Sequence, residues 1–337
     1  MNSIGTPLMW SLFAAFVVIA LLVDFFALSR QGAHKVSIRE ATIWSLLWVA
    51  VSAAFAGWLW WHLSSSPDEA MRAAANTKLL EFVTGYLVEK ALAVDNVFVF
   101  LMVFTYFSVP AEFQKRVLMI GILAALFLRA VMILIGAWMI ARFHWILYVF
   151  GAFLVFTGIK MWWAAGQEPD LDSNPALNWL RKRMHVAPNY DGERMFTRVD
   201  GVRMATPLLL VVALIGIVDV VFAVDSIPAI FAITTDPFIV LTSNVFAILG
   251  LRAMYFLLAG MQERFHLLSY GLAVVLLFIG TKMLLIDIYK IPIVVSLLTT
   301  AGILAVSMVL SQFIPPKGAR SSYPFARKKR EGAERNS

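Results

Sequence analysis

Long apolar runs separated by short polar segments make up most of the chain. A helix that crosses the ~30 Å hydrocarbon core of a bilayer needs about 20 consecutive, mostly apolar residues. Runs of this kind fall near residues 8–28, 42–61, 79–104, 117–138, 145–165, 207–231, 238–258, 266–286 and 292–313. The pattern therefore predicts an all-α polytopic membrane protein with about nine transmembrane helices.

The composition points to the same class of protein. Of the 337 residues, 61% are hydrophobic and 15% are charged, far more apolar sequence than a soluble core needs. The absence of cysteine excludes disulfides, iron–sulfur clusters and thiolate metal sites within the chain. The first charged side chain is Asp24, so the first run lacks the basic start of a signal peptide and is expected to be retained.

Lysine and arginine are distributed unequally between the two sides of the predicted bundle. Nineteen of them follow odd-numbered spans, and four lie on the opposite side. By the positive-inside rule, the N-terminus is expected outside and the C-terminus in the cytoplasm. The same asymmetry accounts for the net charge of +7, so no nucleic-acid partner is implied.

Two segments of the chain carry the same short motifs in the same order. Each segment contains three spans, so the second copy is expected to enter the membrane from the opposite side, as in the inverted repeats of many secondary transporters. The shared motifs are Ala-Val-Asp from positions 93 and 223, Leu-Arg-Ala from 128 and 251, Arg-Phe-His from 142 and 264, and Gly-x-Lys-Met from 158 and 280.

This duplication divides the chain into six predicted parts. They are two N-terminal transmembrane helices (1–78), the first three-helix repeat (79–165), a cytoplasmic linker loop (166–206), the second three-helix repeat (207–290), a ninth transmembrane helix (291–313) and a basic, disordered cytoplasmic tail (314–337).

Four carboxylates lie inside the matched spans. Asp95 returns as Asp225, and Glu89, six residues upstream, returns as Asp219. A carboxylate near the bilayer centre costs about 3 kcal/mol even on the most lenient insertion scale, so such residues are expected to be functional. Because the matched spans run in opposite directions, their acids can face each other at mid-depth and form a cation site.

Uncharged oxygen donors accompany the acids. Residues seven apart on a helix differ by only about 20° in direction, so Asn96 shares a face with Glu89, as Ser226 does with Asp219. Such hard oxygen ligands suit Mg²⁺, Ca²⁺ or Mn²⁺. The five histidines lie near span ends or in loops and are therefore poor candidates for ligands of a central metal site. Pro228 removes a backbone hydrogen bond and could free one more carbonyl ligand. The predicted metal ligands are Glu89, Asp95, Asn96, Asp219, Asp225 and Ser226.

Basic side chains lie in the same spans, so the acids have an alternative, structural interpretation. Lys90 adjoins Glu89, and Arg129 and Arg252 occupy matching deep positions, so the acids could instead tie helices together as ion pairs. We interpret both arginines as structural counter-ions. An acid cluster without metal would hold a proton that metal binding expels, which is a physical basis for metal–proton exchange. The accessory positions are Asp24, Lys90, Arg129, Asn244 and Arg252.

Residues 85–99, residues 219–231 and the Leu-Arg-Ala-Met-Tyr run from Leu251 resemble the TerC family of tellurium-resistance membrane proteins, and its Alx branch most closely. The resemblance covers nearly all of residues 1–313. It implies a bacterial inner-membrane protein linked to Mn²⁺ export, manganese homeostasis and the metal loading of exported proteins. It also implies that the four membrane acids handle the ion. The chain departs from the family pattern at Gly216, where the family usually carries a glutamate.

Two functions that are not enzymatic follow from these observations. The first is a divalent-cation transporter that exports Mn²⁺ by alternating access, with proton coupling as a hypothesis and no permanently bound cofactor. The alternative is an accessory membrane protein that delivers metal to exported proteins, with the secretion machinery as partner and the loop 166–206 as docking surface. An intramembrane aspartyl protease is disfavoured, because the segment from Gly216 to Asp219 lacks the Gly-x-Gly-Asp pattern of such enzymes.

Overall fold

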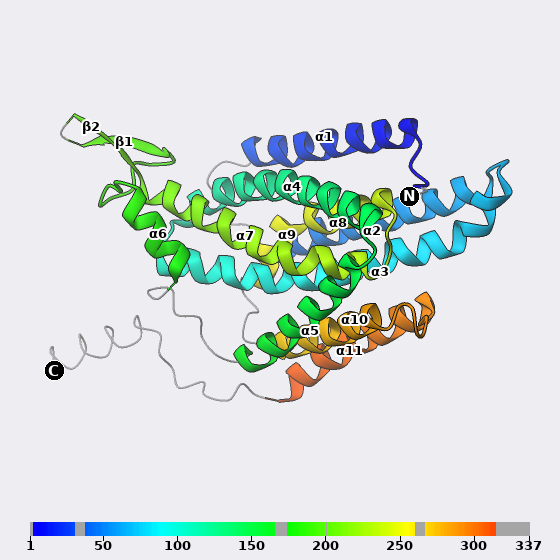
Figure 1. Cartoon of the computed structure of the whole chain (residues 1–337). Helices are drawn as coiled ribbons and strands as arrows, with labels where there is room; N and C mark the ends of the chain where they lie inside the picture. Colours follow the sequence, from blue (N-terminus) through cyan, green and yellow to red (C-terminus); the bar gives the residue numbers. More distant parts are fainter. Residues whose placement is uncertain (1–2, 31–37, 166–173, 200, 260–266, 315–337) are drawn as a thin grey trace.

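The computed structural model describes residues 3–30, 38–165, 174–199, 201–259 and 267–314, and for residues 24–30 it describes the helix without the side chains. These parts of the chain form eleven helices and one short hairpin (Figure 1). The elements are α1 (Pro7–Arg30), α2 (Ile38–Ser64), α3 (Glu69–Tyr106), α4 (Ala111–Arg142), α5 (Ile146–Ala164), α6 (Pro175–Arg183), β1 (Phe196–Val199), β2 (Val202–Ala205), α7 (Pro207–Phe231), α8 (Pro237–Leu249), α9 (Leu251–Leu258), α10 (Leu268–Leu284) and α11 (Ile293–Phe313).

The predicted all-α polytopic membrane architecture is confirmed. Within the described residues, five helices are long and apolar enough to cross a membrane, namely α2, α4, α5, α7 and α11, and the pair α8–α9 would be a sixth. Shorter apolar helical stretches cover residues 7–23 of α1 and the whole of α10. Each of the apolar ranges in the sequence coincides with a helix or with the α8–α9 pair. The number of membrane crossings and the inverted orientation of the repeats stay predictions.

The range 238–258, expected as one continuous helix, is broken. Helix α8 ends at Leu249 and α9 begins at Leu251, with Gly250 between them and a bend of 42°. A Cβ at Gly250 would lie 2.9 Å from Nζ of Lys90 and 3.1 Å from Cβ of Trp48, so glycine is the residue that fits this close approach. The break therefore comes from packing against α2 and α3, which the sequence of the span does not reveal.

Buried apolar side chains form two clusters that share four helices. One cluster also draws on α1, α2, α6 and α9, and the other on α5, α10 and α11. Helices α3, α4, α7 and α8 contribute to both: on α4, for example, Leu126 belongs to the first and Ile133 to the second. Large apolar side chains such as Phe127 and Trp138 stay exposed on the outer surface, as expected for helices that face lipid.

Helices α5 and α10, the third helices of the two repeats, cross in direct backbone contact. A Cβ at Gly280 would lie 2.8 Å from the carbonyl oxygen of Gly151, and a Cβ at Gly158 would lie 3.0 Å from the carbonyl oxygen of Ala273. Small residues allow this close approach between membrane helices. In the repeat, Gly158 matches Gly280 and Gly151 matches Ala273. Swapping the two repeats therefore turns each of these contacts into the other. That exchange is the pattern expected of two copies related by a two-fold axis.

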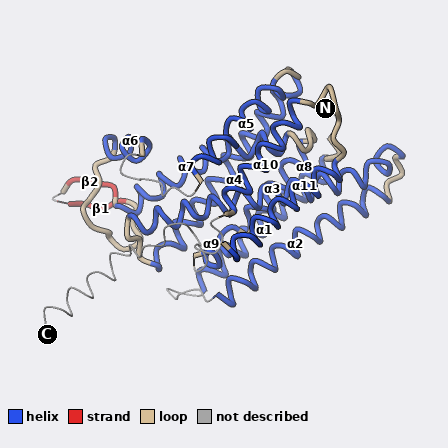
Figure 2. The backbone as a smooth tube through the Cα atoms, turned by 90° about the horizontal axis from the view of Figure 1, so that it is seen from below, coloured by secondary structure: helices blue, strands red, loops and turns tan. Residues whose placement is uncertain are grey.

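The predicted linker loop folds into α6 and the hairpin of β1 and β2. Both lie at the end of the bundle where α3 ends and α7 begins (Figures 1 and 2). The side chain of Asn174 caps α6 by accepting hydrogen bonds from the backbone N–H groups of Ala176 and Leu177, and Leu177 is fully buried. The Tyr190 hydroxyl donates a hydrogen bond to the carbonyl of Phe107 at 2.8 Å, which ties the loop to α3.

Substituting Gly280 with alanine tests the crossing of α5 and α10. The added methyl group meets backbone atoms of Gly151 and Val155 at under 3.0 Å, so a helix has to move. We expect Gly280→Ala to lower the melting temperature in detergent by roughly 5 °C, in line with the cost of overpacking. Gly302→Ala on α11 is the matched control, because its Cβ meets nothing within 4 Å. Equal melting temperatures of the two variants would show that the crossing is not tightly packed.

Candidate functional site

Three helices bring two acids, an arginine and a serine together in the interior. The guanidinium of Arg129 on α4 forms an ion pair with Glu89 on α3 and donates from Nη1 to Oγ of Ser226 at 3.2 Å. Its Nη2 lies 3.5 Å from Oδ1 of Asp219 on α7. None of the four residues is more than 5% exposed. We call Glu89, Arg129, Asp219 and Ser226 the acid–arginine cluster.

The positions of these residues follow from the sequence pattern of each helix. Asp219 and Ser226 are seven residues apart and therefore share one face of α7. The acid–arginine cluster lies where the two apolar clusters meet: on α7, Ile215 belongs to the first and Ala223 to the second, with Asp219 between them. A polar group thus interrupts an otherwise continuous apolar core at mid-helix.

The acid–arginine cluster has more acceptor atoms than donors. Oε2 of Glu89 and Oδ2 of Asp219 are buried and have no hydrogen-bond partner, and Nε of Arg129 is also unpaired. Two carboxylates and one guanidinium carry a formal charge of −1. Removing such charges from water costs several kcal/mol per ion, so each unpaired oxygen favours an approaching cation. Carboxylate oxygens are ligands that Mg²⁺, Ca²⁺ and Mn²⁺ accept.

Asn244 is an unpaired polar side chain on a neighbouring helix, α8. It is 0% exposed, and neither atom of its amide has a partner. Its helix, α8, packs against both α3 and α4, the helices of Glu89 and Arg129. Leaving a buried amide unpaired costs about 1–3 kcal/mol, so this side chain calls for a functional explanation. Asn96, the other predicted amide ligand, is 4% exposed on α3.

The other two acids hydrogen-bond to hydroxyl groups on the third helices. Ser269 on α10 donates to Oδ1 of Asp95 at 2.8 Å, and Thr157 on α5 donates to Oδ1 of Asp225 at 3.2 Å. Each aspartate therefore contacts the third helix of the opposite repeat. Lys160, one turn after Thr157, is close enough to attract the carboxylate of Asp225. We call these two hydrogen bonds the cross-repeat bonds.

The four acids do not lie together in this structure: two join the acid–arginine cluster, and two form the cross-repeat bonds. Among the described residues, no three side chains of His, Asp or Glu lie close enough to hold a metal ion together. The reason is the spacing within each helix: residues six apart point about 120° from each other. Glu89 and Asp219 consequently face the interior, while Asp95 and Asp225, both half-buried, face the third helices.

The remaining predicted positions are spread over the bundle. Nζ of Lys90 donates to the carbonyl of Ala247 at 3.1 Å, so a positive charge caps the C-terminal end of α8, where the helix dipole is negative. Arg252 lies within electrostatic reach of Lys115 at the start of α4. The side chain of Asp24 lies outside the described residues.

Helix α7 runs unbroken through Pro228 to Phe231, and the proline leaves the carbonyl of Val224 without its helical N–H partner.

Sequence reasoning did not single out Thr157 and Ser269. Isolated hydroxyl residues are common in membrane helices, and only the contact with an acid distinguishes these two.

Sequence reasoning also missed a polar cluster at the end of the bundle where α3 begins. There Glu81 accepts from Lys78 at 2.9 Å and from Thr234 at 2.6 Å, and Asp236 accepts from the backbone N–H of Ile4 at 3.1 Å. These contacts tie the N-terminus to the segment between α7 and α8.

Space is available beside Asp219 at the position where the sequence departs from the TerC pattern. Gly216 lies one turn before Asp219, and a Cβ built on it meets nothing within 4 Å. The first carbon of a side chain therefore fits there without displacing a neighbour.

Comparisons with known proteins agree with the membrane architecture. The family profile described as "Integral membrane protein TerC family" matches residues 74–319. The "Putative membrane-bound redox modulator Alx" of Escherichia coli (strain K12) is 54% identical over 314 residues, which cover 93% of this chain and 97% of that protein. The "Uncharacterized membrane protein STKORF319" of Myxococcus xanthus is 47% identical over 309 residues, covering 92% and 93%. No solved structure matches the chain.

Removing the charge of Arg129 tests how strongly the acid–arginine cluster depends on it. Arg129→Gln leaves two buried carboxylates without a counter-ion, so we expect the free energy of unfolding in detergent to fall by about 3–5 kcal/mol. The triple variant Arg129→Gln/Glu89→Gln/Asp219→Asn carries no charge in the acid–arginine cluster and should recover much of that loss, because no unpaired charge remains.

The matched control for this experiment is Arg116→Gln. Arg116 pairs with Glu193 at 2.9 Å, but both side chains are about half exposed. Surface pairs of this kind contribute about 0–1 kcal/mol. A loss at Arg129 no larger than that of the control would contradict the assignment of Arg129 as the buried counter-ion.

Proposed function

Because the chain belongs to the TerC family of integral membrane proteins, we propose that it transports divalent cations across the bacterial inner membrane, with Mn²⁺ efflux as its main activity. One observation supports this proposal above all. Glu89 and Asp219, which occupy equivalent positions in the two repeats, meet at one buried arginine, and each keeps one oxygen without a partner. Equivalent residues that meet in the interior are typical of the sites of repeat-built transporters.

The donor set fits a hard cation as the transported substrate. The unpaired oxygens of Glu89 and Asp219, the Ser226 hydroxyl and the amide oxygen of Asn244 are all oxygen ligands, which suit Mn²⁺, Mg²⁺ or Ca²⁺. The chain has no cysteine to prefer a soft metal. For the same reason, a redox-modulating role, as in the name of its Alx relatives, cannot depend on thiols of this chain. Transport of Mn²⁺, itself a redox-active ion, is compatible with that name.

In this mechanism Arg129 takes the place of the cation between transport events. Its guanidinium and an incoming dication compete for the charge of the same two carboxylates and repel each other, so cation binding requires Arg129 to move away from at least one acid. After release, the arginine returns and pairs the acids again, which spares the empty carrier two unpaired buried charges. The arginine thus allows the transporter to change conformation without its substrate.

The cross-repeat bonds have a different role in this mechanism. Asp95–Ser269 and Asp225–Thr157 each join one repeat to the third helix of the other. If the repeats rock against each other, as alternating access requires, these two contacts have to break and re-form in turn. Asp95 and Asp225 would then control the conformational change, while Glu89, Asp219, Ser226 and Asn244 bind the ion.

The decisive test is Mn²⁺ flux into proteoliposomes that contain the full chain. We expect Glu89→Gln/Asp219→Asn to lose at least about nine-tenths of the flux together with Mn²⁺ binding, because one buried charged hydrogen bond alone changes an equilibrium about tenfold. Asp95→Asn/Asp225→Asn should keep Mn²⁺ binding, measured by calorimetry, and lose flux. Glu193→Gln, which removes an exposed acid, is the control. A dye in the lumen reports whether protons move in the opposite direction.

Two outcomes would contradict transport at this site. Native flux in the folded Glu89→Gln/Asp219→Asn variant would place the ion path elsewhere. Native protein that gives no flux above empty liposomes would refute transport and favour the delivery of metal to exported proteins.

The space beside Asp219 provides an independent test. Gly216→Glu adds a third carboxylate one turn from Asp219 and brings the charge of the enlarged site to −2, which a dication neutralises. We expect Mn²⁺ to bind about tenfold more tightly, a change of about 1.4 kcal/mol. Gly216→Gln has the same shape without the charge and should leave the affinity within about twofold. Unchanged or weaker binding in Gly216→Glu would count against the proposed site.

A further inference from the structure

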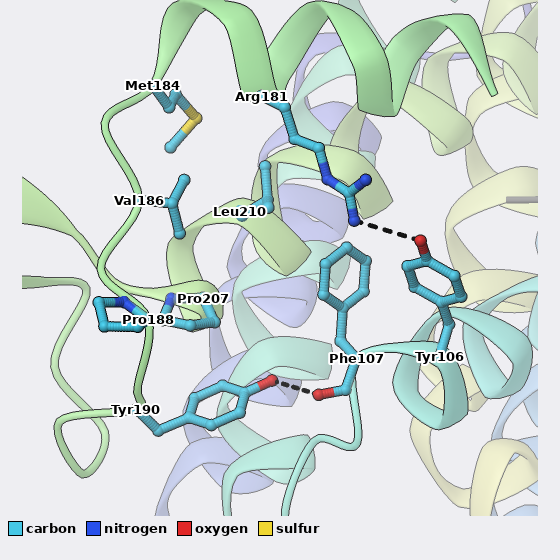
Figure 3. Close-up of a pocket in the computed structure, with 9 residues that line it drawn as sticks. All are labelled: Tyr106, Phe107, Arg181, Met184, Val186, Pro188, Tyr190, Pro207 and Leu210. Carbon is cyan, nitrogen blue, oxygen red and sulfur yellow. Dashed lines mark hydrogen bonds between the residues drawn. The ribbon is translucent and has the colours of Figure 1, made fainter. Parts of the chain in front are cut away.

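A cavity of about 570 Å³ lies at the end of the bundle where α3 ends and α7 begins. Figure 3 shows that its walls come from four places: Tyr106 and Phe107 at the end of α3, Arg181 on α6, the segment from Met184 to Tyr190, and the first turn of α7. It lies far along α3 from the acid–arginine cluster, since Tyr106 is 17 residues after Glu89. The proposed transport makes no use of it.

One positive charge faces this cavity, and no acid lines it within the described part of the chain. Nη2 of Arg181 donates to the hydroxyl of Tyr106 at 3.2 Å, and its guanidinium lies over the same ring at 6.0 Å. This hydrogen bond uses one of the five N–H donors that a guanidinium carries. The part of the cavity wall beside Arg181 is apolar, with Met184, Val186 and Leu210 (Figure 3). The cavity therefore combines an anion-binding group with an apolar surface.

The surroundings of the cavity are positively charged. Helix α6 ends in three consecutive basic residues, Arg181, Lys182 and Arg183. Two acids in the described part of the loop are paired with arginines: Asp191 lies 3.6 Å from Arg194, and Glu193 lies 2.9 Å from Arg116. A ligand with a negative charge is therefore attracted to this face by the basic residues of α6.

Helix α6 has the features of a helix that lies at a membrane surface. Leu177 and Leu180 are buried on one side, whereas the ring of Trp179 is 56% exposed beside the basic residues. Tryptophan and basic side chains are enriched at the level of lipid headgroups. The cavity also adjoins the ends of two long membrane helices, α3 and α7, where headgroups are expected.

We propose that this cavity binds an anionic phospholipid, with the phosphate against Arg181 and the glycerol and upper acyl chain against Met184, Val186 and Leu210. The planar guanidinium offers paired N–H donors that match two phosphate oxygens. The apolar wall favours the lipid over a small soluble phosphate. A lipid bound here contacts the end of α3 and the start of α7 together, and so links the two repeats at this face of the membrane.

Native mass spectrometry of the full chain in detergent tests this proposal, with phosphatidylglycerol and phosphatidylcholine of identical acyl chains as probes. We expect phosphatidylglycerol to be retained several-fold more than phosphatidylcholine. Arg181→Gln should lower its affinity about tenfold, as loss of a charge-assisted hydrogen bond does. Lys182→Gln, which removes the same charge one residue away and does not line the cavity, should change it less than about twofold.

A second variant separates the cavity from charge alone. Met184→Trp keeps every charge and fills part of the apolar wall, so it should also weaken the retention of phosphatidylglycerol; thermal melting verifies that both variants fold. Inorganic phosphate and glycerol phosphate serve as competitors, and neither should displace the lipid at millimolar concentration. Equal losses in Arg181→Gln and Lys182→Gln, native retention in Met184→Trp, no preference in the native chain, or displacement by free phosphate would each overturn the proposal.

Discussion

The pairing of two buried carboxylates with one arginine is the constraint on which the arrangement of α3, α4 and α7 depends. Glu89, Arg129 and Asp219 come from three different helices, and their pairing in the interior fixes the rotation of each helix about its own axis. The apolar core on either side is continuous apart from this point. Hydrophobic packing alone would allow each helix many orientations about its own axis, because lipid and core are equally apolar. The buried charges select one of them.

Helix geometry explains why the four acids make two different kinds of contact. A spacing of six residues directs two side chains of one helix to different neighbours, so one acid of each repeat reaches the arginine and the other reaches a hydroxyl on a third helix. In the proposed mechanism, the acids that bind the ion and the acids that form the cross-repeat bonds therefore lie on the same two helices, α3 and α7. A change at one acid would be transmitted to the other through a rigid helix, without a chain of intermediate side chains.

Much of the fold could be predicted from the sequence, because the thickness of a bilayer leaves few choices for an apolar run. The ranges around residues 79–104 and 207–231, for example, coincide with parts of α3 and α7. The break at Gly250 could not be predicted, since it depends on Lys90 and Trp48 from other helices. The same limit applies to the site. The repeat identified Glu89 and Asp219 as equivalent residues. It could not show which faces of distant helices meet, because packing decides this. The separate positions of Asp95 and Asp225 follow from that packing.

The crossing of α5 and α10 has a mechanical consequence. Where Gly151 and Gly280 touch, backbone meets backbone, and no side chain lies between them that could change rotamer. Such a contact cannot be compressed or reshaped, and it presents the same surface at different crossing angles. It therefore has the properties of a fulcrum: the two helices can pivot about a fixed point while their far ends travel. Any rocking of one half of this protein against the other would have its smallest displacement at these glycines and its largest at the two membrane surfaces.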